Sequence, residues 1–421
     1  MHKNILLIVG FVCLAASPCR PERIQDAQSL FDRFGDRLYQ ILLVEKTSGE
    51  TYSTGSGFQI TETGHIATNY HVVASLIHKP GTYRMECIDK NGTHRPLALL
   101  NIDIVNDLAI VQCDGLADTF FELQERHLSK GAKIYAMGNP YDLSMAIVEG
   151  NYNGLLEDRL YERIFFSGAL NPGMSGGPAI DQRGRVVGIN VSTRGNEIGF
   201  LVPVRFLIYL LAMVQSAVEP VVDFDRRIEQ QLLDNQERFM ADVMAAKWEI
   251  ESYGDARIPK IQKKYIKGWG ETVPAEKKMY RRSFSGYAIP NGVYVSRGVL
   301  TGRLKVSYDW ITTDQLNSVQ FYNKVQKIFN AYSSPNSASS KDRSGYRKRT
   351  AFLHHAGLNW KLSIGVRKYL KYDRLYDYTL NMVSLSKTDR AIVVSTALAG
   401  VSKENGDAFI RKFIEHIQWQ N

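Results

Sequence analysis

The feature that most constrains the fold is a series of short apolar segments, separated by turn residues, between residues 38 and 203. Each is about 5–8 residues long, as β-strands are. Clusters such as Ser53-Thr-Gly55 and Lys90-Asn-Gly92 indicate turns between them. Many short strands indicate an antiparallel sandwich or barrel, and about 165 residues suffice for two barrels. The predicted strands are Leu38–Glu45, Gly57–Thr61, His65–Asn69, Tyr83–Asp89, Pro96–Ile102, Leu108–Cys113, Lys133–Met137, Met145–Glu149, Arg163–Ser167, Ala179–Ile180, Val186–Val191 and Gly199–Pro203.

A helical pattern follows the strand-like region. Phe206–Val214 is apolar but too short to span a bilayer, and it would end the β-rich part. Within Val222–Ile250, apolar residues recur at helical spacing with charges between them. The polar face mixes acidic and basic residues, whereas a helix on a membrane surface is predominantly basic. We therefore predict an amphipathic linker helix over residues 220–250.

Residues 251–421 mix strand-like and helix-like stretches, which predicts an α+β domain. The predicted strands are Gly292–Asp309 (as a pair), Ala351–Val366, Tyr376–Ser384 and Ala391–Ala397. The predicted helices are Thr313–Tyr332 and Ser402–Gln418, with a polar loop over 333–340.

Positive charge is concentrated in this C-terminal part. The net charge of the chain is +9, and residues 251–421 carry 29 basic and 13 acidic side chains, or +16, which leaves −7 for the remainder. The basic clusters are Lys263-Lys264, Lys277-Lys278, Arg281-Arg282 and Tyr346-Arg-Lys-Arg349. Such clusters bind anionic lipid, an acidic envelope polymer or nucleic acid, or they form a solvated face.

The first residues have the pattern of an export signal. Lys3 supplies the positive start, and the short apolar run Ile5–Ala16 leads to small residues. We predict a signal peptide over 1–19 that is cleaved on export to the periplasm or the exterior, with an uncleaved anchor as the alternative. Because export permits disulfides, Cys87 and Cys113 form either a disulfide or two buried thiols.

A glycine-rich turn, Asn171-Pro-Gly-Met-Ser-Gly-Gly-Pro178, presents a single serine. Serine becomes nucleophilic when a base lies beside it and backbone N–H groups point at the developing oxyanion. Gly173 and Gly176 bracket Ser175 and permit the tight backbone that such a nest of N–H groups needs. The N–H groups of Gly173 and Ser175 are therefore candidates for an oxyanion hole.

A histidine and an aspartate upstream complete the set of groups that acyl transfer requires. His71 lies where a strand turns toward a short helix, and Asp107 lies at the start of an apolar strand. The imidazole accepts the serine proton, and the carboxylate holds its tautomer and stabilises the imidazolium. His354-His355 and the other histidines lack the spacing of metal ligands, so we predict neither a metal nor a cofactor.

Five motifs occur in order and define a resemblance. They are Gly55-Ser-Gly-Phe58, Thr68-Asn-Tyr-His-Val-Val73, Asp107-Leu-Ala109, Gly138-Asn-Pro140 and the turn over 171–178. Residues 38–215, about two-fifths of the chain, resemble trypsin-like serine peptidases of the chymotrypsin fold, in particular the HtrA/Deg branch. The resemblance implies a mainly β fold of two six-stranded antiparallel barrels with the triad in the cleft between them.

The resemblance also assigns roles to residues. His71 would be the general base, Asp107 its orienting acid and Ser175 the nucleophile. Asp103 is a rival acid, but Asp107 precedes the Leu-Ala of the family's motif. Met174 replaces an aspartate that digestive relatives pair with a freed N-terminus, so activation by clipping is not expected. Residues 251–421 show no PDZ pattern, although HtrA relatives usually carry PDZ domains.

The primary substrate pocket is inferred from the same resemblance. The residue six before the serine lines the base of this pocket in the family, and here that residue is Ala169. The strand residues Ile189, Asn190 and Val191 would form its wall. Because no carboxylate lies there, we expect small or medium aliphatic side chains at the cleavage site.

These observations predict an exported serine endopeptidase with a signal peptide (1–19), a trypsin-like domain (20–219), a linker helix (220–250) and a basic α+β accessory domain (251–421). Its partners would be protein or peptide substrates in the cell envelope. The alternative is a latent scaffold that binds an anionic envelope component or a protein. Nucleic acid is the partner least expected for an exported chain. The sequence leaves the oligomeric state open, and a homo-oligomer is one alternative.

Overall fold

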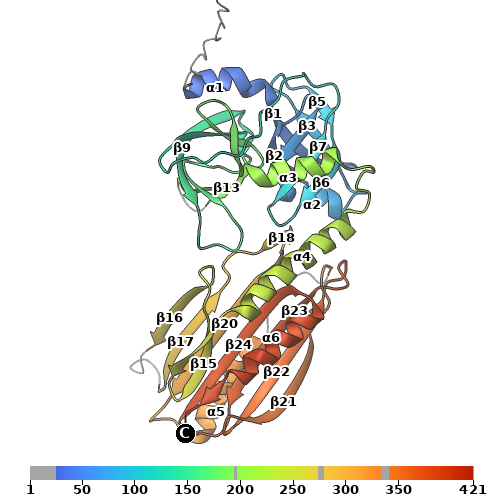
Figure 1. Cartoon of the computed structure of the whole chain (residues 1–421). Coiled ribbons are helices and arrows are strands. Elements are labelled where there is room, and N and C mark those ends of the chain that lie inside the picture. Colours follow the sequence, from blue (N-terminus) through green and yellow to red (C-terminus); the bar gives the residue numbers. More distant parts are fainter. Residues whose placement is uncertain (1–24, 194–196, 274–278, 334–340, 421) are drawn as a thin grey trace, which may run out of the picture.

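The computed structural model describes residues 25–193, 197–273, 279–333 and 341–420. Two β-rich parts are joined by the long helix α4 (Phe224–Ala245), which runs from the first part along the second (Figure 1). The predicted signal peptide and the pair Lys277-Lys278 lie outside the described residues. No helix within those described ranges is both long and apolar enough to cross a bilayer.

The first sheet has seven antiparallel strands in the order β5-β4-β1-β2-β3-β7-β6. The helix α2 (Tyr70–His78) follows β3 and packs on this sheet. An apolar core that includes Ile41, Ile66, Val73 and Val111 fills the space between them. The strands are β1 (Leu38–Glu45), β2 (Thr51–Gln59), β3 (His65–Thr68), β4 (Tyr83–Ile88), β5 (His94–Pro96), β6 (Ala98–Asp103) and β7 (Leu108–Gln112).

The second sheet is a closed barrel in the order β10-β13-β12-β11-β8-β9. A shared core joins it to the first sheet, because Phe58 and Leu108 pack in one cluster with Tyr135 and Ile180. The mainly β fold with paired barrels of chymotrypsin type is thus confirmed, although the first sheet does not close into a ring of hydrogen bonds. The elements are α1 (Ala27–Phe34), β8 (Lys133–Gly138), β9 (Ala146–Leu155), β10 (Ile164–Ser167), β11 (Pro178–Asp181), β12 (Val186–Thr193), β13 (Gly199–Pro203) and α3 (Val204–Gln215).

The turn predicted at Ser53-Thr-Gly55 is wrong, since these residues lie inside β2. The glycines there make room for neighbouring side chains. A Cβ on Gly55 would lie 2.7 Å from Val72 Cγ2, and a Cβ on Gly57 would lie 2.8 Å from Ile66 Cγ2. Glycine in a strand thus marks a close approach rather than a turn here.

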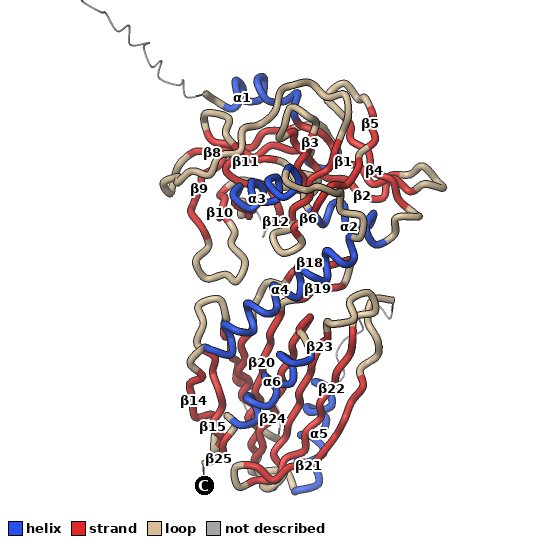
Figure 2. Tube along the Cα trace, turned by 45° about the vertical axis from the view of Figure 1, so that its right-hand side comes forward, coloured by secondary structure: helices blue, strands red, loops and turns tan. Residues whose placement is uncertain are grey.

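The C-terminal part is built on a second seven-stranded antiparallel sheet, in the order β16-β17-β20-β24-β23-β22-β21. Figure 2 shows α4, α5 and α6 lying along this sheet, and the predicted α+β class is confirmed. The elements are β14 (Trp248–Tyr253), β15 (Ala256–Ile261), β16 (Lys267–Val273), β17 (Arg281–Ala288), β18 (Val293–Ser296), β19 (Val299–Thr301), β20 (Arg303–Thr312), α5 (Ser318–Ser333), β21 (Arg347–His355), β22 (Leu358–Lys368), β23 (Tyr376–Ser384), β24 (Arg390–Val401), α6 (Lys403–Glu415) and β25 (Gln418–Trp419).

Two predicted boundaries differ from the structure. The single strand predicted over Ala351–Val366 is a hairpin, because Ala356 (φ 49°) and Gly357 (φ 77°) form a two-residue turn between β21 and β22. The predicted linker helix ends at Ala245, and Trp248 already pairs with Ile261 in a strand.

The two parts contact each other through α4 and the β18–β19 hairpin. Gln231 of α4 accepts a hydrogen bond from Ile104 N (2.8 Å) and donates one to Ile102 O (2.7 Å). Its amide thus satisfies backbone groups at the β6 edge of the first sheet, where no further strand of the described part of the chain pairs. Ile228 and Val295 pack in the same apolar cluster as the α2 residues. The C-terminal part is therefore fixed against the helix that follows β3.

The two described cysteines are thiols. The Sγ atoms of Cys87 and Cys113 lie 3.6 Å apart in the core of the first sheet, and both residues are buried. Of the two alternatives that the sequence left open, the structure contains two buried thiols.

Candidate active site

One carboxylate fixes both the backbone and the side chain of His71. Asp107 Oδ2 accepts a hydrogen bond from His71 Nδ1 at 2.7 Å, and its Oδ1 accepts one from His71 N at 2.8 Å. His71 is the second residue of α2, and the side chain of the N-cap residue Asn69 does not cap this helix. Asp107 therefore supplies the missing cap while it orients the imidazole, and its charge lies where the helix dipole favours an anion.

The backbone around Asp107 is held in an uncommon conformation. Its φ is +65°, in the left-handed region that aspartate tolerates better than most residues. Asn69 Nδ2 donates to Asp107 O at 2.8 Å and so supports this turn. Both carboxylate oxygens of the rival acid Asp103 accept hydrogen bonds from Asn106, one from its backbone and one from its side chain.

The electrostatic surroundings of His71 favour its charged form. Burial lowers the pKa of His71, but the charge of Asp107 and its hydrogen bond outweigh this effect, so the pKa lies above the ordinary value for histidine. The His71 side chain is 30% exposed and that of Asp107 is 14% exposed. The imidazole is therefore open on one side and paired on the other, as a proton acceptor for a bound molecule needs to be.

Ser175 lies in a turn that hydrogen bonds from β2 hold in place. Ser56 Oγ donates to Gly173 O at 2.7 Å, and Ser56 N donates to Ser175 O at 2.8 Å. Gly176 (φ +89°) packs so closely on the strand–helix junction that a Cβ there would lie 3.0 Å from Asn69 N. The structure thus brings Ser175 beside the junction that carries His71. In the described part of the chain, no hydrogen bond joins Ser175 Oγ to the imidazole.

The N–H groups on either side of Met174 in this turn remain available to a ligand. The N–H groups of Met174 and Gly177 donate within the turn, and that of Gly176 donates to Asn190 O. The hydrogen bonds of the described residues do not use the N–H groups of Gly173 and Ser175. Gly173 has φ +97°, and a Cβ there would lie 2.3 Å from Asn139 O. A backbone nest for an anion requires such unused N–H groups and a residue with positive φ.

A small cavity opens next to Ser175. Its volume is about 90 Å³, less than the ~150 Å³ of a cavity that holds benzene. Its lining residues are Leu170, Asn171, Pro172, Met174, Ser175, Asn190 and Val191. Two of the residues predicted for the pocket wall, Asn190 and Val191, are among them. Ala169 is exposed, Ile189 is fully buried, and neither lines this cavity, whereas Leu170 does.

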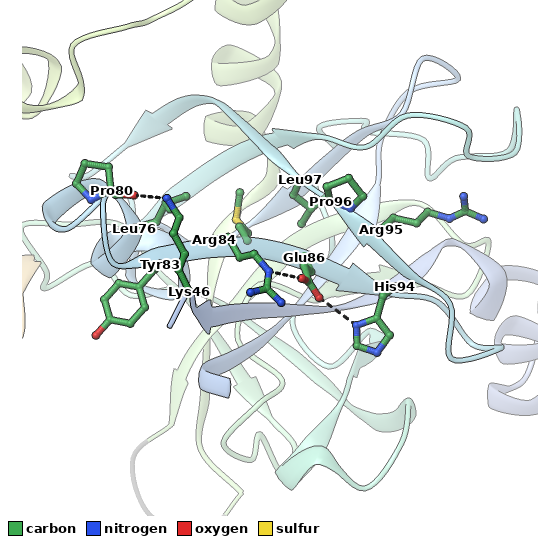
Figure 3. A pocket seen from close by; sticks show the side chains of 11 residues that line it. Lys46, Leu76, Pro80, Tyr83, Arg84, Glu86, His94, Arg95, Pro96 and Leu97 are labelled. Carbon is green, nitrogen blue, oxygen red and sulfur yellow. Dashed lines mark hydrogen bonds and ion pairs between the residues drawn. The ribbon is translucent and has the colours of Figure 1, made fainter. Parts of the chain in front are cut away.

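A larger cavity of about 480 Å³ lies on the first sheet near the end of β4 (Figure 3). Glu86 lines this cavity and accepts hydrogen bonds from Arg84 Nε (2.7 Å) and His94 Nδ1 (3.1 Å). None of Ser175, His71 and Asp107 lines it. This hollow is therefore separate from the candidate active site.

Sequence reasoning missed Ser56 and Asn69 as supporting residues. Both occur in the motifs that carry the resemblance, but their contacts join segments far apart in the chain. Ser56 Oγ also accepts a hydrogen bond from Asn139 N at 2.8 Å, so this residue of β2 is linked to two separate loops. Polar residues beside glycines in those motifs were the signal available in the sequence.

Comparison with known proteins agrees with this geometry. Residues 55–189 match the family model of the trypsin-like peptidase domain. This part of the chain is similar to trypsin-like peptidase domains, so the resemblance inferred from the motifs is confirmed for it.

Curated proteins similar to this part of the chain are named as proteases. "Protease Do-like 5, chloroplastic" from Arabidopsis thaliana is 30% identical over 36% of this chain and 52% of its own length. "Putative serine protease HhoA" from Synechocystis is 33% identical over 46% of this chain and 54% of its own. "Probable periplasmic serine endoprotease DegP-like" from Chlamydia pneumoniae is 28% identical over 44% and 40%.

The similarity is limited in extent. The chain spans about half, or less, of the length of these relatives. The solved structure of Deg5 aligns with 45% of this chain and 93% of its own, with 27% identity and a TM-score of 0.39.

Proposed function

We propose that the protein is a serine endopeptidase in which Ser175, His71 and Asp107 form a catalytic triad. The observation that carries this proposal is the double hydrogen bond of Asp107 to His71, beside a turn with two available N–H groups. A carboxylate in this position sets the Nδ1–H tautomer, which leaves Nε2 free to accept a proton.

The chemistry follows from these positions. Substrate binding would bring Ser175 Oγ within reach of His71 Nε2, because catalytic hydrogen bonds often tighten only in the complex. Ser175 Oγ attacks the peptide carbonyl carbon and transfers its proton to His71. The N–H groups of Gly173 and Ser175 hold the oxyanion. His71 then protonates the departing amine, and water hydrolyses the acyl-enzyme by the same steps.

We further propose small aliphatic side chains at the cleavage site and an exported location. The cavity beside Ser175 is small, and Leu170 and Val191 line it with apolar surface. A DegP-like relative is named as periplasmic, which supports export and a role in envelope protein quality control or processing. The proposed domains are a signal peptide (1–19), a protease domain (20–219), a linker (220–250) and an accessory domain (251–421).

Casein hydrolysis and a fluorophosphonate probe test this function. We expect the purified protein to cleave unfolded casein and to be labelled on Ser175. Ser175→Ala should abolish both, while Ser129→Ala, at an exposed loop serine, should change neither. Labelling that persists in Ser175→Ala, or wild-type protein that neither cleaves nor labels, would overturn the proposal.

A second candidate function is binding of an amphipathic anion by the C-terminal part. A cavity of about 680 Å³ there combines apolar residues with Arg303, Lys305, Arg343 and Arg367. Asp377 pairs with Arg343 (2.9 Å) and Arg367 (2.7 Å), so one carboxylate neutralises only one of two buried guanidinium groups. Surplus positive charge beside apolar surface favours an anionic head with an apolar chain.

Dodecyl phosphate, with inorganic phosphate as the chainless control, tests this second function. Trp269 lines the cavity, so binding should change its fluorescence saturably, and Lys305→Gln should weaken the response. Lys327→Gln, on an exposed helix position, is the matched control. An equal response to inorganic phosphate, or no saturation, would exclude an amphipathic ligand.

A further inference from the structure

The β18–β19 hairpin of the C-terminal part is attached to the helix that carries His71. In Figures 1 and 2, β18 lies at the end of the C-terminal part that faces the barrels. Val295 O accepts hydrogen bonds from Tyr70 Oη (2.7 Å) and from His78 Nε2 (2.9 Å). These donors come from the first and the last residue of α2, and their polar atoms meet at this one carbonyl, 3.2 Å from each other.

Alternating residues of β18 have different surroundings. Val293 and Val295 are buried, at 2% and 1% exposure, in the apolar cluster that also contains Tyr70 and Val72. Tyr294 between them is only partly buried, and it packs against the same cluster. The two valines are thus enclosed by the cluster, whereas Tyr294 lies partly open to solvent.

The ring of Tyr294 lies against the candidate catalytic imidazole. The ring centroids of Tyr294 and His71 are 6.3 Å apart with an angle of 82° between the ring planes, an edge-to-face contact. The ring of Tyr70 also contacts the Tyr294 ring, with the centroids 6.4 Å apart and an angle of 65° between the ring planes. His71 thus contacts both Asp107, through Nδ1, and an aromatic ring from the other part of the chain.

We propose that Tyr294 is a positioning residue for His71, so that the β18–β19 hairpin completes the active site. The ring restricts the imidazole to the orientation that faces Asp107 and excludes water from one of its sides. This inference rests on the proposed function. It makes residues 251–421 part of the catalytic unit, because a contact with the general base originates there.

The groups around His71 define the expected electrostatic effect of removing the ring. Asp107 is the charged partner, and Tyr70 and Tyr294 are neutral phenols whose pKa values burial raises. Burial lowers the pKa of the nearby Arg163, although the charges of Asp107 and Asp103 oppose this. Removing the Tyr294 ring would hydrate the imidazole. Because burial lowers the pKa of His71, that pKa would then rise.

Three variants of the full chain test the proposal. Tyr294→Ala should lower kcat on the order of tenfold and change KM by less than about twofold, since alignment is lost but substrate contacts are not. Tyr294→Phe keeps the ring and should retain wild-type kinetics. Phe352→Ala removes an aromatic side chain of the same part that is 73% exposed, and it controls for general effects of truncation.

Titration of His71 by NMR provides a readout that does not require turnover. With ¹³C-labelled histidine, Tyr294→Ala should raise the His71 pKa above that of wild type, whereas Tyr294→Phe and Phe352→Ala should not. An unchanged His71 titration in Tyr294→Ala would overturn the proposal, and so would an equal loss of kcat in Tyr294→Phe. Failure of wild-type protein to label with fluorophosphonate would instead refute the protease function, while the titration still reports on the contact.

Discussion

The double role of Asp107 makes Asp107→Asn the most informative substitution. Oδ1 of residue 107 accepts the hydrogen bond of His71 N at 2.8 Å, so an asparagine would keep its oxygen there and turn Nδ2 toward His71 Nδ1. Two donors cannot face each other, so the imidazole proton would move to Nε2. That nitrogen could then no longer accept the serine proton.

The loss can be estimated from this geometry. A wrong tautomer costs about 10⁴-fold in kcat, or about 5.4 kcal/mol of transition-state stabilisation. The helix cap persists through Oδ1, so the stability cost is limited to the lost charge at the helix terminus, about 0.3–1 kcal/mol. The variant should therefore be folded and almost inactive.

The assay compares kcat on a peptide substrate with the ¹⁵N shifts that report the His71 tautomer. Asp103→Asn is the matched control, because Asp103 faces Asn106 and should leave kcat nearly unchanged. The reasoning is refuted if Asp107→Asn retains more than about a tenth of the activity, or if Asp103→Asn is the variant that loses it.

Three further predictions concern the same site. The value of kcat/KM should fall as pH decreases through the raised pKa of His71, because imidazolium cannot accept a proton; a midpoint at or below the ordinary histidine value would contradict this. Gly176→Ala should lower the Tm and abolish probe labelling, because its Cβ would lie 2.3 Å from Ser56 O at φ +89°; native-like melting would count against it. Leu170→Ala should enlarge the cavity beside Ser175 and shift cleavage of a peptide library, read by mass spectrometry, toward larger side chains, and an unchanged preference would place the specificity elsewhere.

Much of the fold is predictable from periodicity. Leu38–Glu45 is a strand in both prediction and structure, and the helices after residue 203 and residue 402 differ only at their ends. The strands over residues 248–288 were missed. β16 is an edge strand with two glycines and exposed residues, so it lacks the apolar alternation that burial on one face produces.

The candidate site likewise has one part that the sequence predicts and another that it does not. Short motifs carry Ser175, His71 and Asp107, because the chemistry requires those residue types and the turn requires glycine. Contacts between distant segments leave no local pattern. Tyr70 and Val295 are 225 residues apart, and nothing in either segment predicts their hydrogen bond. Ala169 and Ile189 were assigned to the pocket by resemblance alone, and neither lines the cavity beside Ser175, whereas Leu170 does.

The apolar cluster around α2 has a consequence for how the chain unfolds. Tyr70 and Ile77 share this cluster with Leu232 of α4, Val295 of the hairpin and Leu375 of the loop before β23. A break after residue 219 would expose the apolar sides of both α2 and α4 to water. Segments that share one buried core unfold together, because separating them exposes that core to water. The first sheet, α4 and the hairpin should therefore melt in one transition. A protease fragment cut at the linker would aggregate through its exposed apolar surface.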